Sequence, residues 1–144
     1  METTRYYIDV NVFVYWLGEH PLFGKTAHEW IQKISKTSLS SSIEYVTSSL
    51  TVYEVLCVLA GLAGKNLKNR PFIEQITGAL TQLKGLTIEP LKPNDLIVAT
   101  ELLSSNKLDY KDALHLAVAK RIGAQKIITN DKDFDEIADI QRIF

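Results

Sequence analysis

The sequence predicts an α/β/α sandwich, in which a central, mainly parallel sheet of 4–5 strands carries helices on both faces. Short apolar segments with the length of buried strands alternate with longer segments of helical periodicity. Such alternation implies parallel pairing with helices on both sides of the sheet. The chain has 144 residues and is 46% hydrophobic, which is enough for one core, so we expect a single domain over residues 1–144.

The first half of the chain contains two predicted strands and four predicted helices. Residues 5–9 are a short apolar segment ending on Asp9, which predicts a buried strand. Residues 10–17 are apolar on most sides and predict a short buried helix that ends at Gly18. The other predicted elements are a helix opened by Pro21, a strand over 43–49, a helix over 52–62 and a helix over 70–85.

The second half continues the alternation. Pro93 begins a predicted helix that extends to Ser105, and residues 109–123 (DYKDALHLAVAKRIG) predict a further helix with Gly123 as its stop signal. The predicted strands are 86–91, 126–129 and a candidate fifth over 139–144. In parallel sheets of this kind, ligands bind just beyond the carboxyl ends of the strands.

Charge and composition exclude several classes of protein. The 16 Lys and Arg nearly balance the 17 Asp and Glu, so a site for a polyanion must be local or bridged by metal ions. The single cysteine, Cys57, excludes an internal disulfide and fits a reducing compartment. The sequence has no signal-peptide pattern and no run of about 18 apolar residues. We therefore expect a cytoplasmic protein with no membrane segment.

Several acidic residues follow predicted strands or begin predicted helices. Asp9 lies within the apolar stretch YYIDVNVFVYW, where burial of an uncompensated carboxylate is costly. The other acids at such positions are Glu54, Asp112, Asp131 and Asp133. Because these positions share one edge of a parallel sheet, their carboxylates would repel one another unless a cation is bound. Carboxylates without a His or Cys cluster suit Mg²⁺ or Mn²⁺, ions that serve phosphoryl chemistry.

Most of these acids also have a purely structural interpretation. Glu54 completes a capping box (TVYE), in which its carboxylate would accept the N–H of Thr51. Asp109 can cap the helix over 109–123, and Asp112 can favour the positive end of that helix. Asp131 can belong to a turn, NDKD. Asp9 is the hardest to explain in this way, because it lies between a buried strand and a buried helix.

Some residues near these acids stay open between packing and function. His115 shares a helix face with Asp112, although its apolar neighbours favour core packing. Lysines and an arginine around residues 107–132 can contact the phosphates of a polyanion or form a solvated helix face.

Three segments, YYIDVNVFV, TSSLTVYEVL and LDYKDALHLAVAKRIGAQKIITNDKDF, resemble in order the motifs of PIN-domain ribonucleases. The resemblance is closest to the VapC-type toxins of type II toxin–antitoxin systems. It implies a PIN-like fold, RNA cleavage dependent on Mg²⁺ or Mn²⁺, a cognate antitoxin and a homodimer. By position it implies the following catalytic and metal-binding residues: Asp9, Glu54, Asp112 and Asp131, with Asn11, Thr129 and Asp133 as supporting polar residues.

The resulting hypothesis is an endoribonuclease in which the acids hold a divalent ion and water attacks the phosphate. Glu54 would ligate the ion or act as general base. One alternative is a PIN nuclease for RNA processing or quality control without an antitoxin. Another is a PIN-like module that binds RNA or protein without cutting, although the intact set of acids argues against it. The RNA target, the number of ions and the oligomeric state do not follow from the sequence.

Overall fold

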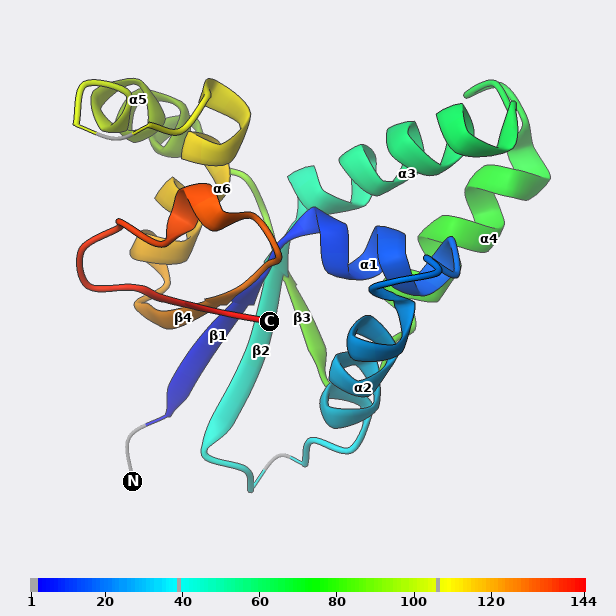
Figure 1. Cartoon of the computed structure of the whole chain (residues 1–144), viewed down its shortest axis with the longest axis horizontal. Coiled ribbons are helices and arrows are strands. Elements are labelled where there is room, and N and C mark those ends of the chain that lie inside the picture. The colour runs from blue at the N-terminus through cyan, green and yellow to red at the C-terminus, as the bar shows by residue number, and fades with distance from the viewer. Residues whose placement is uncertain (1–2, 39, 106) are drawn as a thin grey trace.

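The computed structural model describes residues 3–38, 40–105 and 107–144. A central sheet separates two layers of helices (Figure 1). The strands are β1 (Thr4–Ile8), β2 (Ile43–Ser48), β3 (Leu86–Glu89), β4 (Ala124–Ile128) and β5 (Gln141–Ile143). The helices are α1 (Val10–Leu17), α2 (Gly24–Ser35), α3 (Ser49–Ala63), α4 (Arg70–Thr81), α5 (Pro93–Leu102), α6 (Tyr110–Arg121) and a 3₁₀ helix, η1 (Lys132–Phe134). The predicted α/β/α sandwich is confirmed.

The five strands are all parallel and lie in the order β3-β2-β1-β4-β5. The chain first builds the sheet from β1 toward β3 and then returns to add β4 and β5 on the other side of β1. Because parallel crossovers are right-handed, this reversal moves the helices from one face to the other. The carboxyl ends of β1 and β4 are therefore the switch point, where pockets form in such sheets.

Each face of the sheet has its own core. Helices α1–α4 pack around buried residues such as Phe13 and Ile34, and α6 and η1 pack around Leu116 and Phe134. Neighbouring residues of β1 point to opposite faces, so Ile8 belongs to the first core and Tyr7 to the second. Both cores border the carboxyl end of β1.

Helix α3 begins at Ser49, three residues earlier than the predicted start at residue 52. The reason is local: Ser48 is the N-cap, and its Oγ accepts the backbone N–H of Thr51 at 3.4 Å. Thr51 therefore lies inside the helix, and Glu54 lies in the second turn rather than the first. The interpretation of Glu54 as part of a capping box with Thr51 is wrong.

Other boundaries differ from the prediction by a few residues. Helix α2 begins at Gly24 rather than at Pro21, because Nδ1 of His20 accepts the backbone N–H groups of Leu22 and Phe23 in a turn. Helix η1, with three residues, is too short to show periodicity in the sequence. Within the described ranges, no helix is both long and apolar enough to cross a membrane.

Candidate metal centre

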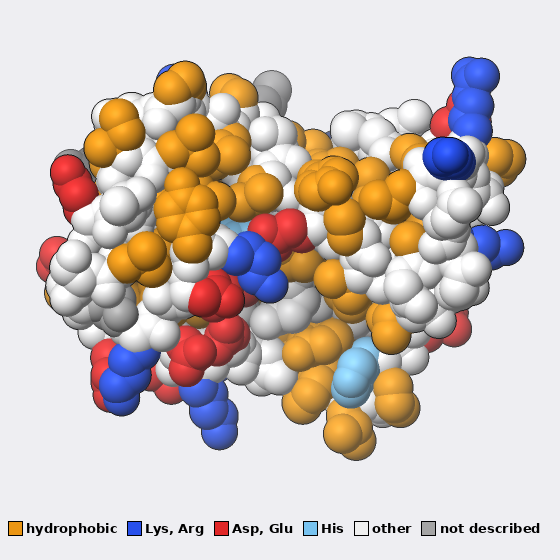
Figure 2. Space-filling model, turned by 90° about the horizontal axis from the view of Figure 1, so that it is seen from above, with side chains coloured by type: hydrophobic (Ala, Val, Ile, Leu, Met, Phe, Trp, Pro, Cys, Tyr) orange, Lys and Arg blue, Asp and Glu red, His pale blue; other side chains and the backbone are white. Residues whose placement is uncertain are grey.

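A pocket at the carboxyl ends of β1 and β4 is lined by all four of the acids expected to bind metal. Its lining comprises Asp9, Val10, Asn11, Val14, Tyr15, Glu54, Val58, Lys111, Asp112 and Asp131. Seen from this edge of the sheet, acidic side chains gather near the middle of the face, with hydrophobic side chains on either side (Figure 2). The lining residues come from four separate segments of the chain, which only the sheet topology brings together.

Asp9 is 5% exposed and receives a hydrogen bond from the residue that follows β4. Oγ1 of Thr129 donates to Asp9 Oδ2 at 2.8 Å. Thr129 Oγ1 also accepts from Asn11 Nδ2 at 3.0 Å and from the backbone N–H of Asp131 at 3.1 Å. Asn11 and Thr129 therefore join the start of α1 to the loop after β4. Asp9 is also the N-cap of α1, where the helix dipole favours a negative charge.

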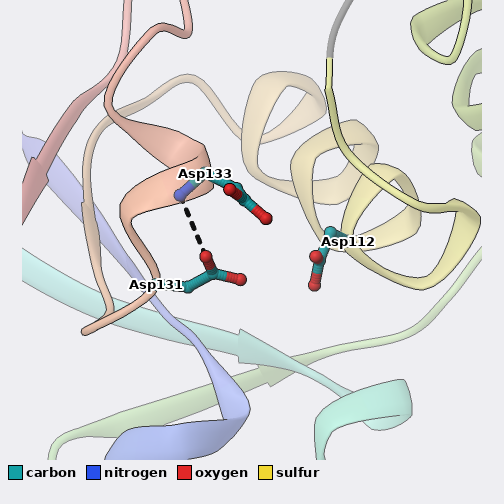
Figure 3. Close-up of side chains that lie close together, drawn as sticks. All are labelled: Asp112, Asp131 and Asp133. Atoms are coloured by element: carbon teal, nitrogen blue, oxygen red, sulfur yellow. Dashed lines mark hydrogen bonds between the residues drawn. The ribbon is translucent and has the colours of Figure 1, made fainter.

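Asp112, Asp131 and Asp133 each offer one oxygen, and these three atoms lie within 4.8 Å of one another. Asp112 stands on α6 and faces the other two, which lie at the start of η1 (Figure 3). Asp131 Oδ1 accepts the backbone N–H of Asp133 at 2.9 Å, which fixes the turn between them. Asp109 Oδ1 accepts the N–H of Asp112 at 2.9 Å, so its predicted role as helix cap is confirmed. Asp133 is the most exposed of the three and lies at the rim.

The negative charges of this cluster repel one another. Burial, together with the negative charges of Asp9, Asp109 and Asp131, raises the pKa of Asp112 to about 7, although Lys111 opposes the change. The three clustered donors are all carboxylates, which are the ligands that Mg²⁺ and Mn²⁺ prefer. The residues present therefore fit a hard divalent cation.

Glu54 reaches the pocket from α3 and is held by His115. Glu54 Oε2 accepts from His115 Nε2 at 3.0 Å, and His115 Nδ1 lies 2.7 Å from the hydroxyl of Tyr7. That hydroxyl donates to Ser48 Oγ at 2.9 Å, so it accepts from the imidazole, and both ring nitrogens act as donors. Burial acts to lower the pKa of His115, but Tyr7 and the nearby carboxylates raise it well above its usual value.

The PIN domain family model matches residues 6–140. The chain belongs to the PIN domain family. No curated protein matches the sequence.

Several solved structures share the fold of this PIN domain at low sequence identity. VapC20 of Mycobacterium tuberculosis, described as a sarcin–ricin loop cleaving toxin, is 16% identical, with 93% of this chain and 97% of that chain covered and a TM-score of 0.68. VapBC2 of Rickettsia felis, bound to a DNA fragment of its promoter, is 17% identical, with 97% and 98% covered and a TM-score of 0.66. VapBC-1 of nontypeable Haemophilus influenzae is 18% identical, with 97% of each chain covered and a TM-score of 0.65. The predicted PIN-like fold is thereby confirmed.

Two parts of this PIN domain's site go beyond the sequence-based expectations. His115 packs in the core, as its apolar neighbours predict, and it also contacts Glu54, which lines the pocket. The position of His115 three residues after Asp112 was the one sequence signal that it lies near the site. Nothing in the sequence indicated that Tyr7 would contact His115. Of the basic residues around 107–132, Lys111 lines the pocket, while Lys107 pairs with Glu136 at 3.5 Å on the surface.

Proposed function

We propose that this PIN domain is an endoribonuclease dependent on Mg²⁺ or Mn²⁺, and that it is the toxin of a type II toxin–antitoxin pair. The observation that carries the nuclease proposal is the convergence of Asp9, Glu54, Asp112 and Asp131 on one pocket. The raised pKa of Asp112 supports it, because a bound cation would stabilise the ionised carboxylate against both its burial and the repulsion of its acidic neighbours.

Asp112 and Asp131 would hold the ion, with Asp133 at the rim and Asp9 on the buried side. A bound Mg²⁺ or Mn²⁺ would supply a water of lowered pKa and neutralise charge on the attacked phosphate. Thr129 and Asn11 would keep Asp9 in place, and Lys111 would bring a positive charge to the substrate phosphate. Glu54, which accepts a hydrogen bond at Oε2, would take a proton at Oε1 or ligate the ion.

The toxin part of the proposal is supported by the fold. VapC20, described as a toxin that cleaves the sarcin–ricin loop, and the VapBC complexes share this architecture over nearly the whole chain. We therefore propose a structured RNA substrate, a cognate antitoxin protein, a homodimer and a cytoplasmic location. A short reading frame beside the gene, whose product binds this chain and inhibits it, would support the toxin. Its absence, with cleavage intact, would favour an RNA-processing nuclease.

The test uses purified protein and a pool of labelled structured and single-stranded RNAs, with Mg²⁺, Mn²⁺ or EDTA. We expect cleavage in Mg²⁺ or Mn²⁺ that is lost in EDTA and in Asp112→Asn. The matched control is Asp109→Asn, which removes a neighbouring charge but keeps a good helix cap, and it should still cleave. If the wild-type protein shows no cleavage and no Mn²⁺ binding, that result contradicts the proposal and favours a non-catalytic module.

A further inference from the structure

We infer that His115 is a positioning residue for Glu54: it holds one carboxylate oxygen so that the other remains available to the acidic pocket. This inference rests on the proposed function, in which Glu54 serves that pocket. His115 itself lies behind the pocket, with 1% of its surface exposed, while Glu54 belongs to the pocket lining. The imidazole therefore acts through the carboxylate and does not contact the substrate.

The imidazole is fixed at both nitrogens. Nε2 lies 3.0 Å from Glu54 Oε2, and Nδ1 lies 2.7 Å from the Tyr7 hydroxyl. A ring that is held at both ends and packed in a core has little freedom to rotate. Its contact with Oε2 thus defines where the carboxylate of Glu54 stands. In the described part of the chain, Oε1 of Glu54 has no hydrogen-bond partner, so that atom remains free for the pocket.

The series of hydrogen bonds begins at Glu54, on α3, and ends at Ser48, the N-cap of the same helix. Tyr7 donates to Ser48 Oγ at 2.9 Å, and Ser48 caps α3 by accepting the N–H of Thr51. Glu54 lies in the next turn of that helix. These hydrogen bonds therefore fix the position of α3 relative to β1, which ends just before Asp9, and relative to α6, which carries Asp112. Their geometric consequence is a fixed relation between Glu54 and the other acids.

Packing alone does not explain these polar groups. Tyr7 and Ser48 are fully buried, and burying polar groups costs free energy that their hydrogen bonds only offset. Apolar residues of similar volume would fill the same space without that cost. Among these hydrogen-bonded residues, Glu54 is the one that reaches the pocket. The arrangement therefore serves to orient the carboxylate of Glu54.

The test compares His115→Leu, which removes both donors, with His115→Gln, whose amide can still donate to Glu54. Partners behind a metal site typically change activity or metal affinity by 10- to 100-fold, so we expect His115→Leu to lower kcat by about that factor. KM for RNA should stay within about twofold, because substrate contacts are unchanged. His115→Gln should recover most of the loss, and Tyr7→Phe should show a smaller loss.

Val118→Ala is the matched control, because this fully buried residue lies on the same helix and belongs to the apolar core with Leu116 and Phe134. It should lower the melting temperature while leaving kcat and the Mn²⁺ dissociation constant unchanged. Equal kcat in His115→Leu and wild type, or an equal loss of kcat in Val118→Ala, would overturn the inference. Glu54→Gln separates the two proposals: if it abolishes cleavage while His115→Leu does not, the nuclease stands and the positioning role falls. If wild-type protein neither cleaves RNA nor binds Mn²⁺, the proposed function itself falls.

Discussion

The hydroxyl of Thr129 donates a 2.8 Å hydrogen bond to Asp9, a residue 120 positions away in the chain. Pairing of Ile8 with Ile128 across the two central strands brings them together. The bond satisfies a buried carboxylate that would otherwise be costly. It also explains why Asp9 can lie at the end of an apolar strand before any ion binds.

Thr129→Val should therefore destabilise the protein. The substitution keeps the shape of the side chain but leaves Asp9 without its donor, which should lower the free energy of unfolding by about 1–3 kcal/mol. Urea denaturation measures this value. Thr129→Ser, which keeps the hydroxyl, is the control and should lose less. Equal stabilities for the Val and Ser variants would show that the hydrogen bond is unimportant.

The stability of the metal-free protein should depend on pH through Asp112. The pKa of this group is about 7 in the folded protein, against an ordinary value of 3.8. The folded state thus holds the proton more tightly, so the contribution of Asp112 is fully present below about pH 4 and is lost as the pH rises through 7. Melting temperatures in EDTA should fall over this range more steeply for wild type than for Asp112→Asn. Parallel curves would contradict the assignment.

Divalent ions should reverse this loss above pH 7. A ligand at 100 times its dissociation constant stabilises the folded state by about 2.7 kcal/mol, so Mn²⁺ should raise the melting temperature at pH 8. The increase should disappear in Asp112→Asn and Asp131→Asn but persist in Asp109→Asn. Calorimetry with and without Mn²⁺ provides the measurement, and an increase retained in both of the first two variants would place the ion elsewhere.

Lys111→Ala should weaken substrate binding. Lys111 is exposed and lines the acidic pocket, and one exposed ion pair contributes at most about 1 kcal/mol, so KM for RNA should rise by up to about fivefold. Lys120→Ala, on the same helix but outside the pocket lining, is the control. Steady-state kinetics at two salt concentrations distinguish the variants. A similar rise in KM for both would indicate a general charge effect instead.

Arg121 should matter for stability and not for chemistry. Its Nε and Nη2 donate to the two carboxylate oxygens of Asp95, at 2.9 and 3.1 Å, and Asp95 is 1% exposed. Arg121→Met leaves that buried charge unpaired, which should cost about 3–5 kcal/mol of unfolding free energy. The double variant Arg121→Met/Asp95→Leu should recover most of this loss in chemical denaturation. If the single variant is as stable as wild type, the pair does not anchor α5 to α6.

The positions of Asp9 and Asp131 were predictable because each follows a short apolar strand, and parallel strands end at the same edge. The position of Asp112 followed from the helix signals around Asp109. The start of α3 was harder, since Ser48, Ser49 and Thr51 are all plausible caps, and only the contact of Ser48 with Thr51 decides between them.

Long-range contacts account for most of what the sequence did not reveal. His115 and Glu54 are 61 residues apart, and no local periodicity of the sequence predicts their contact. The grouping of Asp133 with Asp112 and Asp131 depends on η1, a turn of three residues that carries no pattern of its own. Such features arise from the assembled sheet and cannot be derived from one segment at a time.

The strand order has a consequence for protein synthesis. The pocket needs β1, made first, and the loop after β4, made near the end of the described chain. Pairing of such distant segments has a high contact order and forms late in folding. A nascent chain on the ribosome therefore lacks Thr129, Asp131 and Asp133 beside Asp9 until the loop after β4 has been made. The proposed nuclease site therefore cannot assemble while the chain is shorter than this loop.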